Sequence, residues 1–148
     1  MENPTILLVE DDQEDAVLTL RALKRSNFEN KVFVVRDGRD ALDFLFCTNR
    51  HADRDPRELP QLILLDINLP NINGLEVLRR VRAVERTRQM PIVMLSSSDE
   101  RQDLIESYRN GANSYVRKST DFTQFVETMR KLSSYWLVLN SASPEKSG

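Results

Sequence analysis

Four short apolar runs divide the chain into segments of similar length. Each run is nearly continuous in aliphatic residues, without the alternation of apolar and polar positions that marks a half-buried strand. Such continuity is typical of strands covered on both faces, as in a parallel sheet. The runs are TILLVE at 5–10, KVFVV at 31–35, QLILLD at 61–66 and MPIVMLS at 90–96, and SYV at 114–116 is a weaker fifth.

Stretches of helical length follow each of these runs. Their apolar residues recur at three- and four-residue intervals, which is the period of an amphipathic helix. Val17 in the first stretch and Tyr108 in the fourth are counted among the inward positions, and Gly111 is placed to end the fourth helix. The expected helices cover 13–25, 38–47, 74–85, 100–110 and 121–139.

The order strand–helix, repeated five times, predicts an α/β fold with helices on both faces of a parallel sheet. Right-handed crossovers favour a doubly wound, flavodoxin-like sheet of five strands in the order 2-1-3-4-5, with five helices. We expect one domain over 5–139, because 148 residues suit a single core. Residues 48–60 are expected to form a long polar loop, and 140–148 a flexible tail.

Composition and charge exclude several classes of function. The formal net charge is −2, so the basic stripe of a nucleic-acid binder is not expected. No apolar run approaches the roughly 20 residues that span a bilayer, and the N-terminal residues lack a signal peptide. We therefore expect a cytoplasmic protein. The single Cys47 and the single His51 exclude disulfides, thiolate clusters and multi-histidine sites; His51 is expected in an exposed loop, and Cys47 on a helix face.

Polar residues follow the predicted strands at their carboxyl ends, which is where doubly wound sheets bind ligands. The first strand ends in Glu10 and Asp11, and the third ends in Asp66. The fourth ends in Ser96, and Lys118 follows the fifth. Three acids, a hydroxyl and an ammonium, from segments far apart in the chain, are therefore predicted at one edge of the sheet.

Three carboxylates in a small space repel one another, at a cost on the order of 3 kcal/mol for each pair about 5 Å apart. A divalent cation together with Lys118 would bring this edge near neutrality. Oxygen ligands without His or Cys favour Mg²⁺ or Ca²⁺, and positions left for waters and a phosphoryl oxygen favour Mg²⁺. At such a site a carboxylate can attack phosphorus and form an aspartyl phosphate. Asp12 is expected to cap the helix that begins near Gln13.

These residues and their flanking segments resemble the receiver domain of two-component response regulators. The matching segments are ILLVEDD, LILLDINLPNINGLEVL, PIVMLSSS and GANSYVRKS, and the resemblance runs from about Thr5 to Leu132. It implies a stand-alone regulator that accepts phosphate from a histidine kinase on Asp66 with Mg²⁺. Such a regulator signals by conformational change and protein contact. It is not an enzyme beyond its own phosphorylation and dephosphorylation.

The resemblance also implies roles for other residues. Asp11 matches a direct metal ligand, Glu10 a ligand acting through water, and Asn68 the position whose backbone carbonyl completes the metal site together with Asp66. The remaining matches are Ser96, the switch hydroxyl; Tyr115, the aromatic that turns inward with the switch; and Lys118, the lysine that pairs with the phosphoryl group.

Two residues depart from the family pattern. Proline, with a cis peptide bond, usually follows the lysine, but here Ser119 follows Lys118. A cis bond without proline costs about 3–4 kcal/mol. Two geometries of the bond after Lys118 are therefore open: the cis bond of the family, or a trans bond that changes the direction of the lysine side chain. Asn73 replaces the Asp often found before the turn glycine, and it is expected to serve the turn alone.

A narrower resemblance is to the single-domain regulators that partner bacterial, notably cyanobacterial, phytochrome histidine kinases. It rests on the long 48–60 loop, on KS in place of KP, and on SYWL near the C-terminus. One helical stripe cannot bury the five adjacent apolar residues 135–139. We therefore predict a partner surface, most simply a homodimer interface, made by Tyr135, Trp136 and Leu139. The alternative is a longer last helix whose end folds onto its own domain.

Other interpretations use the same residues. A degenerate receiver would never take phosphate and would act only as a protein-interaction module, but the intact acids and Lys118 argue against it. A phosphohydrolase of the haloacid-dehalogenase type needs a second acid where this chain has Asn68. Three single residues also have a simpler interpretation. Ser96 would be one serine of a serine-rich loop, Lys118 a solvated surface lysine, and Tyr115 a half-buried packing residue.

Overall fold

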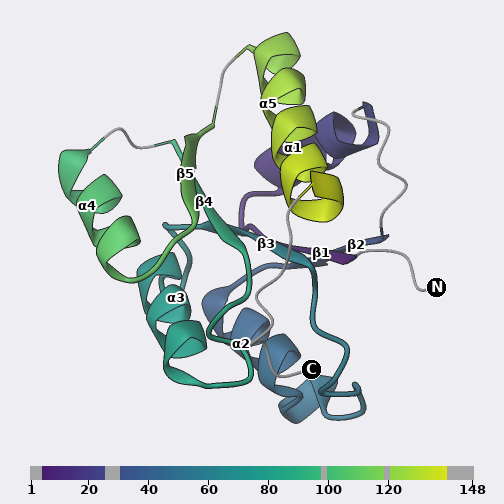
Figure 1. Cartoon of the computed structure of the whole chain (residues 1–148), viewed down its shortest axis with the longest axis vertical. Helices are drawn as coiled ribbons and strands as arrows, with labels where there is room; N and C mark the ends of the chain where they lie inside the picture. The colour runs from purple at the N-terminus through teal and green to yellow at the C-terminus, as the bar shows by residue number, and fades with distance from the viewer. Residues whose placement is uncertain (1–4, 26–30, 98–99, 119–120, 140–148) are drawn as a thin grey trace.

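Five parallel strands form one sheet in the order β2-β1-β3-β4-β5, with helices on both faces (Figure 1). The computed structural model describes residues 5–25, 31–97, 100–118 and 121–139. The strands are β1 (Thr5–Val9), β2 (Lys31–Val35), β3 (Leu62–Asp66), β4 (Ile92–Ser96) and β5 (Ser114–Arg117). The helices are α1 (Gln13–Arg25), α2 (Gly38–Phe46), α3 (Gly74–Ala83), α4 (Arg101–Arg109) and α5 (Phe122–Ser134). The predicted doubly wound fold and its strand order are confirmed.

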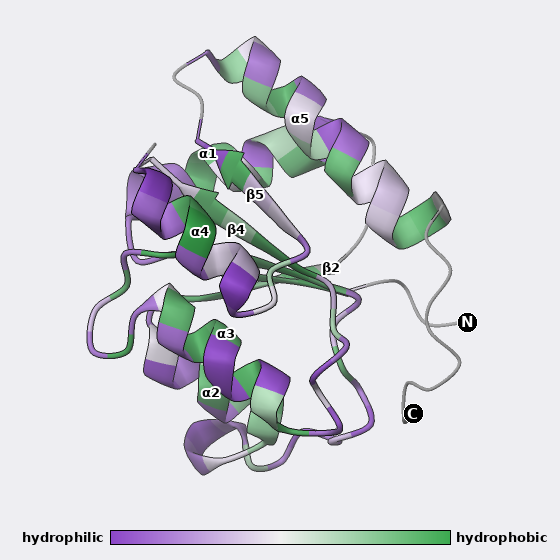
Figure 2. Cartoon of the chain, turned by 60° about the vertical axis from the view of Figure 1, so that its left-hand side comes forward, coloured by the Kyte–Doolittle hydropathy of each residue, from purple (hydrophilic) through white to green (hydrophobic). Residues whose placement is uncertain are grey.

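Alternate side chains of each strand enter two separate apolar clusters. Leu7 and Val9 of β1 pack toward α2 and α3, whereas Ile6 and Leu8 pack toward α1 and α5. In Figure 1, α1 and α5 lie above the sheet, and α2 and α3 lie below it. Figure 2 shows the central strands in green and the helices striped in green and purple. Because both faces are covered, every position of a central strand must be apolar, which explains the continuous runs.

Two of the inward helix faces were predicted incorrectly. Val17 is 41% exposed and lies beside the equally exposed Leu18 on the outer side of α1. The buried positions of α1 include Thr19, a polar residue that the apolar spacing could not indicate. In α4, Tyr108 is 51% exposed while Ser107 is fully buried. Both helices are therefore rotated relative to the faces that apolar spacing suggested, and α1 presents two apolar side chains to solvent.

The 48–60 segment is partly built into the core, and the prediction of an exposed His51 was wrong. A short 3-10 helix, Asn49–His51, buries the His51 ring edge-on against Phe44, with centroids 5.2 Å apart. His51 Nε2 lies 2.7 Å from Asp40 Oδ1, which gives the buried ring a polar partner. Cys47 is also not a helix-face residue, because it ends α2 in the left-handed conformation with φ of 56°.

The last helix ends differently from the prediction of one helix over 121–139. After α5, a π-helical turn covers Tyr135–Leu139. Trp136 and Leu137 pack against the cluster on the α1 face, whereas Tyr135 is 49% and Val138 67% exposed. Part of this segment therefore closes the domain's own core and part faces outward. The side chain of Leu139 lies outside the described part, and the partner surface stays a prediction.

Candidate functional site

Three acids meet at the carboxyl edge of the sheet, as the strand ends indicated. Glu10 follows β1 and is 1% exposed, Asp66 ends β3 and is 5% exposed, and Asp11 is exposed. One carboxylate oxygen from each residue lies within 4.8 Å of the others. We call Glu10, Asp11 and Asp66 the acidic cluster. Glu10 and Asp66 are buried, whereas Asp11 lies on the side of the cluster that faces solvent.

The segment after β3 holds Asp66 firmly in this position. A Cβ atom on Gly74 would lie 2.1 Å from the Asp66 carbonyl oxygen, so only glycine lets α3 begin so close to the strand. The Asn73 side chain caps α3 by accepting a hydrogen bond from the Glu76 backbone N–H at 2.9 Å. Asn73 thus serves the turn, as expected, and Asn68 lies exposed between β3 and this turn.

Lys118 reaches the acidic cluster from the end of β5. Its Nζ lies 2.5 Å from Glu10 Oε1, 2.9 Å from Asp15 Oδ2 and 3.4 Å from Asp66 Oδ2. Its backbone N–H donates to the Ser96 carbonyl at 2.8 Å, which fixes the base of the side chain at the same edge. The solvated-lysine interpretation is therefore wrong for this structure, in which the Lys118 side chain is 13% exposed.

Sequence reasoning missed Asp15, which is the second nearest carboxylate to the Lys118 ammonium. Asp15 lies in the first turn of α1, three residues after Asp12, the residue that caps this helix. The sequence could have indicated Asp15, because α1 begins directly after β1 and the acids of its first turn therefore stay close to the acidic cluster. The Asp15 backbone N–H donates to Asp12 Oδ1 at 3.0 Å, which is the helix cap expected of Asp12.

The two predicted switch residues lie on neighbouring strands. Ser96 is fully buried at the end of β4, one position beyond Leu95, which pairs with Asp66 in the sheet register. Tyr115 on β5 is half-buried and packs against the cluster on the α2 and α3 face. Ser119, on which the geometry of the bond after Lys118 depends, lies outside the described residues.

The site has a surplus of negative charge. Burial raises the pKa of Glu10 to about 7; the hydrogen bond with Lys118 opposes this rise, and nearby Asp66 adds to it. Burial alone would disfavour the Lys118 ammonium, but hydrogen bonds to Glu10 and Asp15 and the charge of Asp66 outweigh it and raise the pKa of Lys118. Lys118 therefore stays protonated at neutral pH, and the pKa of Glu10 lies close to neutrality.

The residues present fit a hard divalent cation. The acidic cluster offers three carboxylate oxygens within 4.8 Å of one another, without a His or Cys ligand. Carboxylate oxygens are the ligands that Mg²⁺ and Mn²⁺ accept, and exposed Asp11 leaves a side of the site free for waters. Such an ion would also offset the negative charge that one ammonium leaves uncompensated.

The raised pKa of Glu10 predicts that cation binding weakens with acid. Below a pH of about 7 the folded, metal-free protein holds a proton on Glu10 that a cation must displace. In chelator the folded state binds more protons than the unfolded chain between the usual carboxyl pKa of 4.5 and about 7, so stability rises as pH falls through this window. We expect the Mg²⁺ affinity measured by calorimetry to fall between pH 8 and pH 6 by several-fold, and Glu10→Gln to flatten this dependence. An equally steep dependence in Glu10→Gln would contradict the assignment.

The sheet and the acids at its edge define a small doubly wound α/β domain with a candidate cation site, and known proteins identify its family. The family model of the response regulator receiver domain matches residues 6–130, and the chain belongs to this family. It is 39% identical over 135 residues to the probable methanogenesis regulatory protein FilR2 of Methanothrix harundinacea, covering 91% of this chain and 84% of that protein. It is 36% identical over 132 residues to response regulator Rcp1 of Synechocystis sp., covering 89% and 88%.

Solved structures extend this similarity. The phosphorylated cyanobacterial phytochrome response regulator RcpA superposes with a TM-score of 0.87 at 32% identity, over 96% of this chain and 99% of that one. The Mn²⁺-bound form of Rcp1 superposes with a TM-score of 0.84 at 32% identity, over 95% and 99%. The narrower resemblance to phytochrome response regulators is thereby confirmed. Within the described residues, no helix has the length and apolar character needed to cross a membrane.

Proposed function

We propose that this chain is a stand-alone response regulator that accepts a phosphoryl group from a histidine kinase on Asp66, with Mg²⁺ bound, and acts in the cytoplasm. The observation that carries the proposal is the meeting of Glu10, Asp11, Asp66 and Lys118 at one sheet edge, from three segments of the chain far apart in sequence. Similarity to a phosphorylated regulator supports it. Phosphorylation shifts the domain between two conformations, and the signal passes on by protein contact.

The geometry assigns a role to each side chain. An Asp66 oxygen attacks the phosphorus of a phosphohistidine, the P–N bond breaks, and the imidazole of the kinase leaves. Lys118 orients the Asp66 carboxylate beforehand and faces the oxygens of the transferred group afterwards. Asp11, Asp66 and the Asn68 backbone carbonyl would hold Mg²⁺, with Glu10 acting through water, and the ion would supply positive charge to the transferred group.

Two neighbours of Asp66 complete the proposed switch. The buried hydroxyl of Ser96, at the adjacent strand end, donates to a phosphoryl oxygen once Asp66 is modified. Tyr115, on the next strand along, then turns toward the space that the Ser96 loop has left. The chain acts as a regulator, and its only chemistry is the gain and loss of its own phosphoryl group.

Incubation with a small acyl phosphate and Mg²⁺ tests the function directly. We expect the intact wild-type chain to gain the mass of one phosphoryl group, and the gain to disappear when a chelator removes the cation. A wild-type chain that stays unmodified at saturating donor and Mg²⁺ would contradict the proposal and favour the degenerate receiver, which only binds partners.

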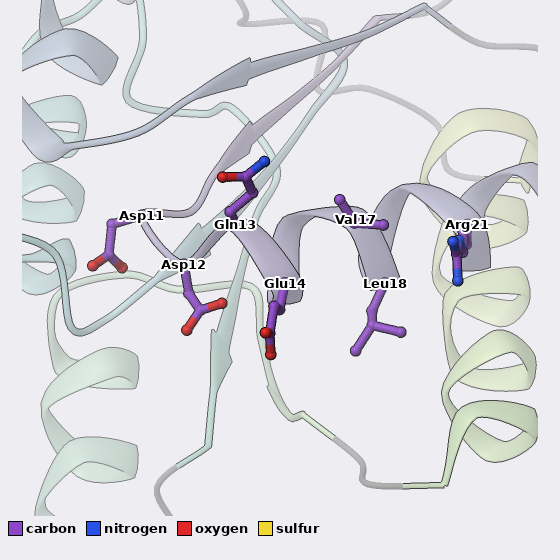
Figure 3. Close-up of a pocket in the computed structure, with 7 residues that line it drawn as sticks. All are labelled: Asp11, Asp12, Gln13, Glu14, Val17, Leu18 and Arg21. Atoms are coloured by element: carbon purple, nitrogen blue, oxygen red, sulfur yellow. The ribbon is translucent and has the colours of Figure 1, made fainter.

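The outer side of α1 is the proposed docking surface for the kinase. Figure 3 shows Val17 and Leu18 on α1, one to two turns after Asp11 and Asp12, in a shallow pocket closed by Arg21. These two exposed apolar side chains line the same pocket as Asp11 of the acidic cluster, so a partner seated on them can bring a phosphohistidine toward Asp66. Similarity to phytochrome response regulators supports a bacterial phytochrome as the kinase.

Leu18→Arg tests this surface. We expect it to slow phosphotransfer from the kinase by at least about tenfold, equivalent to about 1.4 kcal/mol, because it buries a charge in the apolar contact. Phosphorylation by the small acyl phosphate should be unchanged, since Leu18 does not contact the acidic cluster. Val84→Arg is the matched control, because Val84 is 40% exposed at the end of α3. Equal effects of the two substitutions on kinase transfer would contradict docking at α1.

The exposed part of the π-helical turn is proposed as a homodimer surface. Tyr135 stacks edge-to-face on Trp136, with centroids 4.9 Å apart, and Val138 adds a largely exposed apolar side chain. Tyr135 and Val138 would form the centre of a self-complementary patch. We expect a dimer by sedimentation at micromolar concentration and a monomer for Val138→Lys. Monomeric wild-type protein, phosphorylated or not, would contradict this interface.

A further inference from the structure

The three carboxylates around Lys118 differ in what else they can bind. Glu10 and Asp66 belong to the acidic cluster, whose oxygens are close enough to share one cation. Asp15 lies 2.9 Å from the same ammonium but outside that cluster. Asp15 is therefore the one carboxylate near Lys118, among the described residues, that a bound cation would leave to the lysine.

We propose that Asp15 is a positioning residue that keeps the Lys118 ammonium in the site while the Asp66 carboxylate, and Glu10 through water, hold a divalent cation. The inference rests on the proposed function, in which Lys118 faces the phosphoryl group on Asp66. Asp15 itself touches neither the cation nor the phosphoryl group, and it acts through the lysine.

Asp15 is needed because the Lys118 ammonium and a bound cation compete for the same two carboxylates. Lys118 contacts Glu10 Oε1 at 2.5 Å and Asp66 Oδ2 at 3.4 Å, and a cation in the acidic cluster draws on the carboxylates of the same two residues, Asp66 directly and Glu10 through water. Two positive charges a few ångströms apart repel strongly in a partly buried site. Without another anion, the lysine would either resist cation binding or leave the edge. Asp15 offers a third contact, so the lysine can release the Glu10 and Asp66 carboxylates without leaving the site.

The position of Asp15 suits this task. Its backbone N–H is fixed by the Asp12 cap, so the carboxylate projects from the first, ordered turn of α1. Its side chain is 38% exposed, whereas that of Glu10 is 1% exposed, so the Asp15 carboxylate meets the lysine from the solvent side of the site. The contact also joins α1 to the segment after β5, which lies 103 residues away in sequence.

Asp15→Asn is the decisive substitution, and Glu14→Gln is its control. Both remove one negative charge from the first turn of α1, but Glu14 is exposed and is not among the carboxylates that Lys118 contacts in the described structure. Mg²⁺ affinity of the unphosphorylated protein is measured by calorimetry. We expect Asp15→Asn to weaken Mg²⁺ binding about tenfold, equivalent to about 1.4 kcal/mol, and Glu14→Gln to weaken it less than about twofold. Asp15→Glu, which restores a carboxylate, should recover most of the affinity.

A double-mutant cycle separates positioning from simple charge loss. In a Lys118→Met background no ammonium competes for the oxygens, so Asp15→Asn should weaken Mg²⁺ binding no more than Glu14→Gln does. An equal effect of the two substitutions in the wild-type background, or an undiminished Asp15 effect without Lys118, would overturn the inference. The mass gain of the wild-type chain with acyl phosphate is measured separately. Its absence would contradict the proposed function, but the double-mutant cycle on Mg²⁺ affinity would still decide the role of Asp15.

Discussion

Asp66→Asn is expected to take up no phosphate under conditions in which the wild-type chain gains one phosphoryl group from an acyl phosphate and Mg²⁺. The amide has nearly the same shape as the carboxylate, so the fold and the contacts of β3 are retained, but its oxygen is no longer an anionic nucleophile. Intact-protein mass spectrometry measures the gain. No other substitution is expected to act so completely, because the other side chains assist a reaction that Asp66 itself performs.

Two comparisons make this result specific. Asp12→Asn removes a charge from the next exposed acid but retains the helix cap, since Asn caps as well as Asp, and it should be phosphorylated normally. Lys118→Met should slow uptake by roughly 10²-fold, the usual effect of removing one donor to developing charge. Phosphate uptake by Asp66→Asn at the wild-type level would show that another residue is the acceptor.

Asp66→Asn is also expected to stabilise the protein in chelator. Each like-charged pair in the acidic cluster costs on the order of 3 kcal/mol, and the Lys118 contact with Asp66 at 3.4 Å offsets part of this repulsion. If Asp66→Asn relieves a net repulsion of about 1 kcal/mol, the melting temperature should rise by about 2–4 °C for a chain of this size. Asp11→Asn should act in the same direction but more weakly, because Asp11 is exposed to water.

Mg²⁺ should reverse this order. We expect the cation to bind the folded wild-type protein and raise its melting temperature, and a cluster without the Asp66 carboxylate to bind it poorly. Differential scanning calorimetry in chelator and in millimolar Mg²⁺ measures both effects, with Asp12→Asn again as the control. A melting temperature in chelator that is unchanged or lowered for both Asp66→Asn and Asp11→Asn would count against a crowded acidic site.

The fold and the meeting of the acids could be predicted because both follow from the strand pattern. Continuous aliphatic runs identify buried parallel strands, and every parallel strand ends at the same edge. Glu10, Asp66 and Lys118 could therefore be placed together without any knowledge of distances. Gly74 is a clear example of the agreement between sequence and structure, because the turn after Asp66 leaves no room for a Cβ atom.

The features that were missed depend on tertiary packing. The burial of His51 needs the ring of Phe44 and the Asp40 carboxylate, which come from α2 and not from the loop itself. The outward position of Val17 follows from the rotation of α1, in which the polar Thr19 takes a buried place. Asp15 was missed because helix-start acids commonly serve the helix dipole, and only the path of the Lys118 side chain shows its second role.

The most direct test of the central claim is anomalous diffraction from a crystal soaked in Mn²⁺. One strong peak is expected between the ends of β1 and β3, bonded to oxygens of Asp11 and Asp66, with Lys118 still paired to Asp15. A fully occupied ion elsewhere on the surface, or no ion between these strand ends at saturating Mn²⁺, would contradict it.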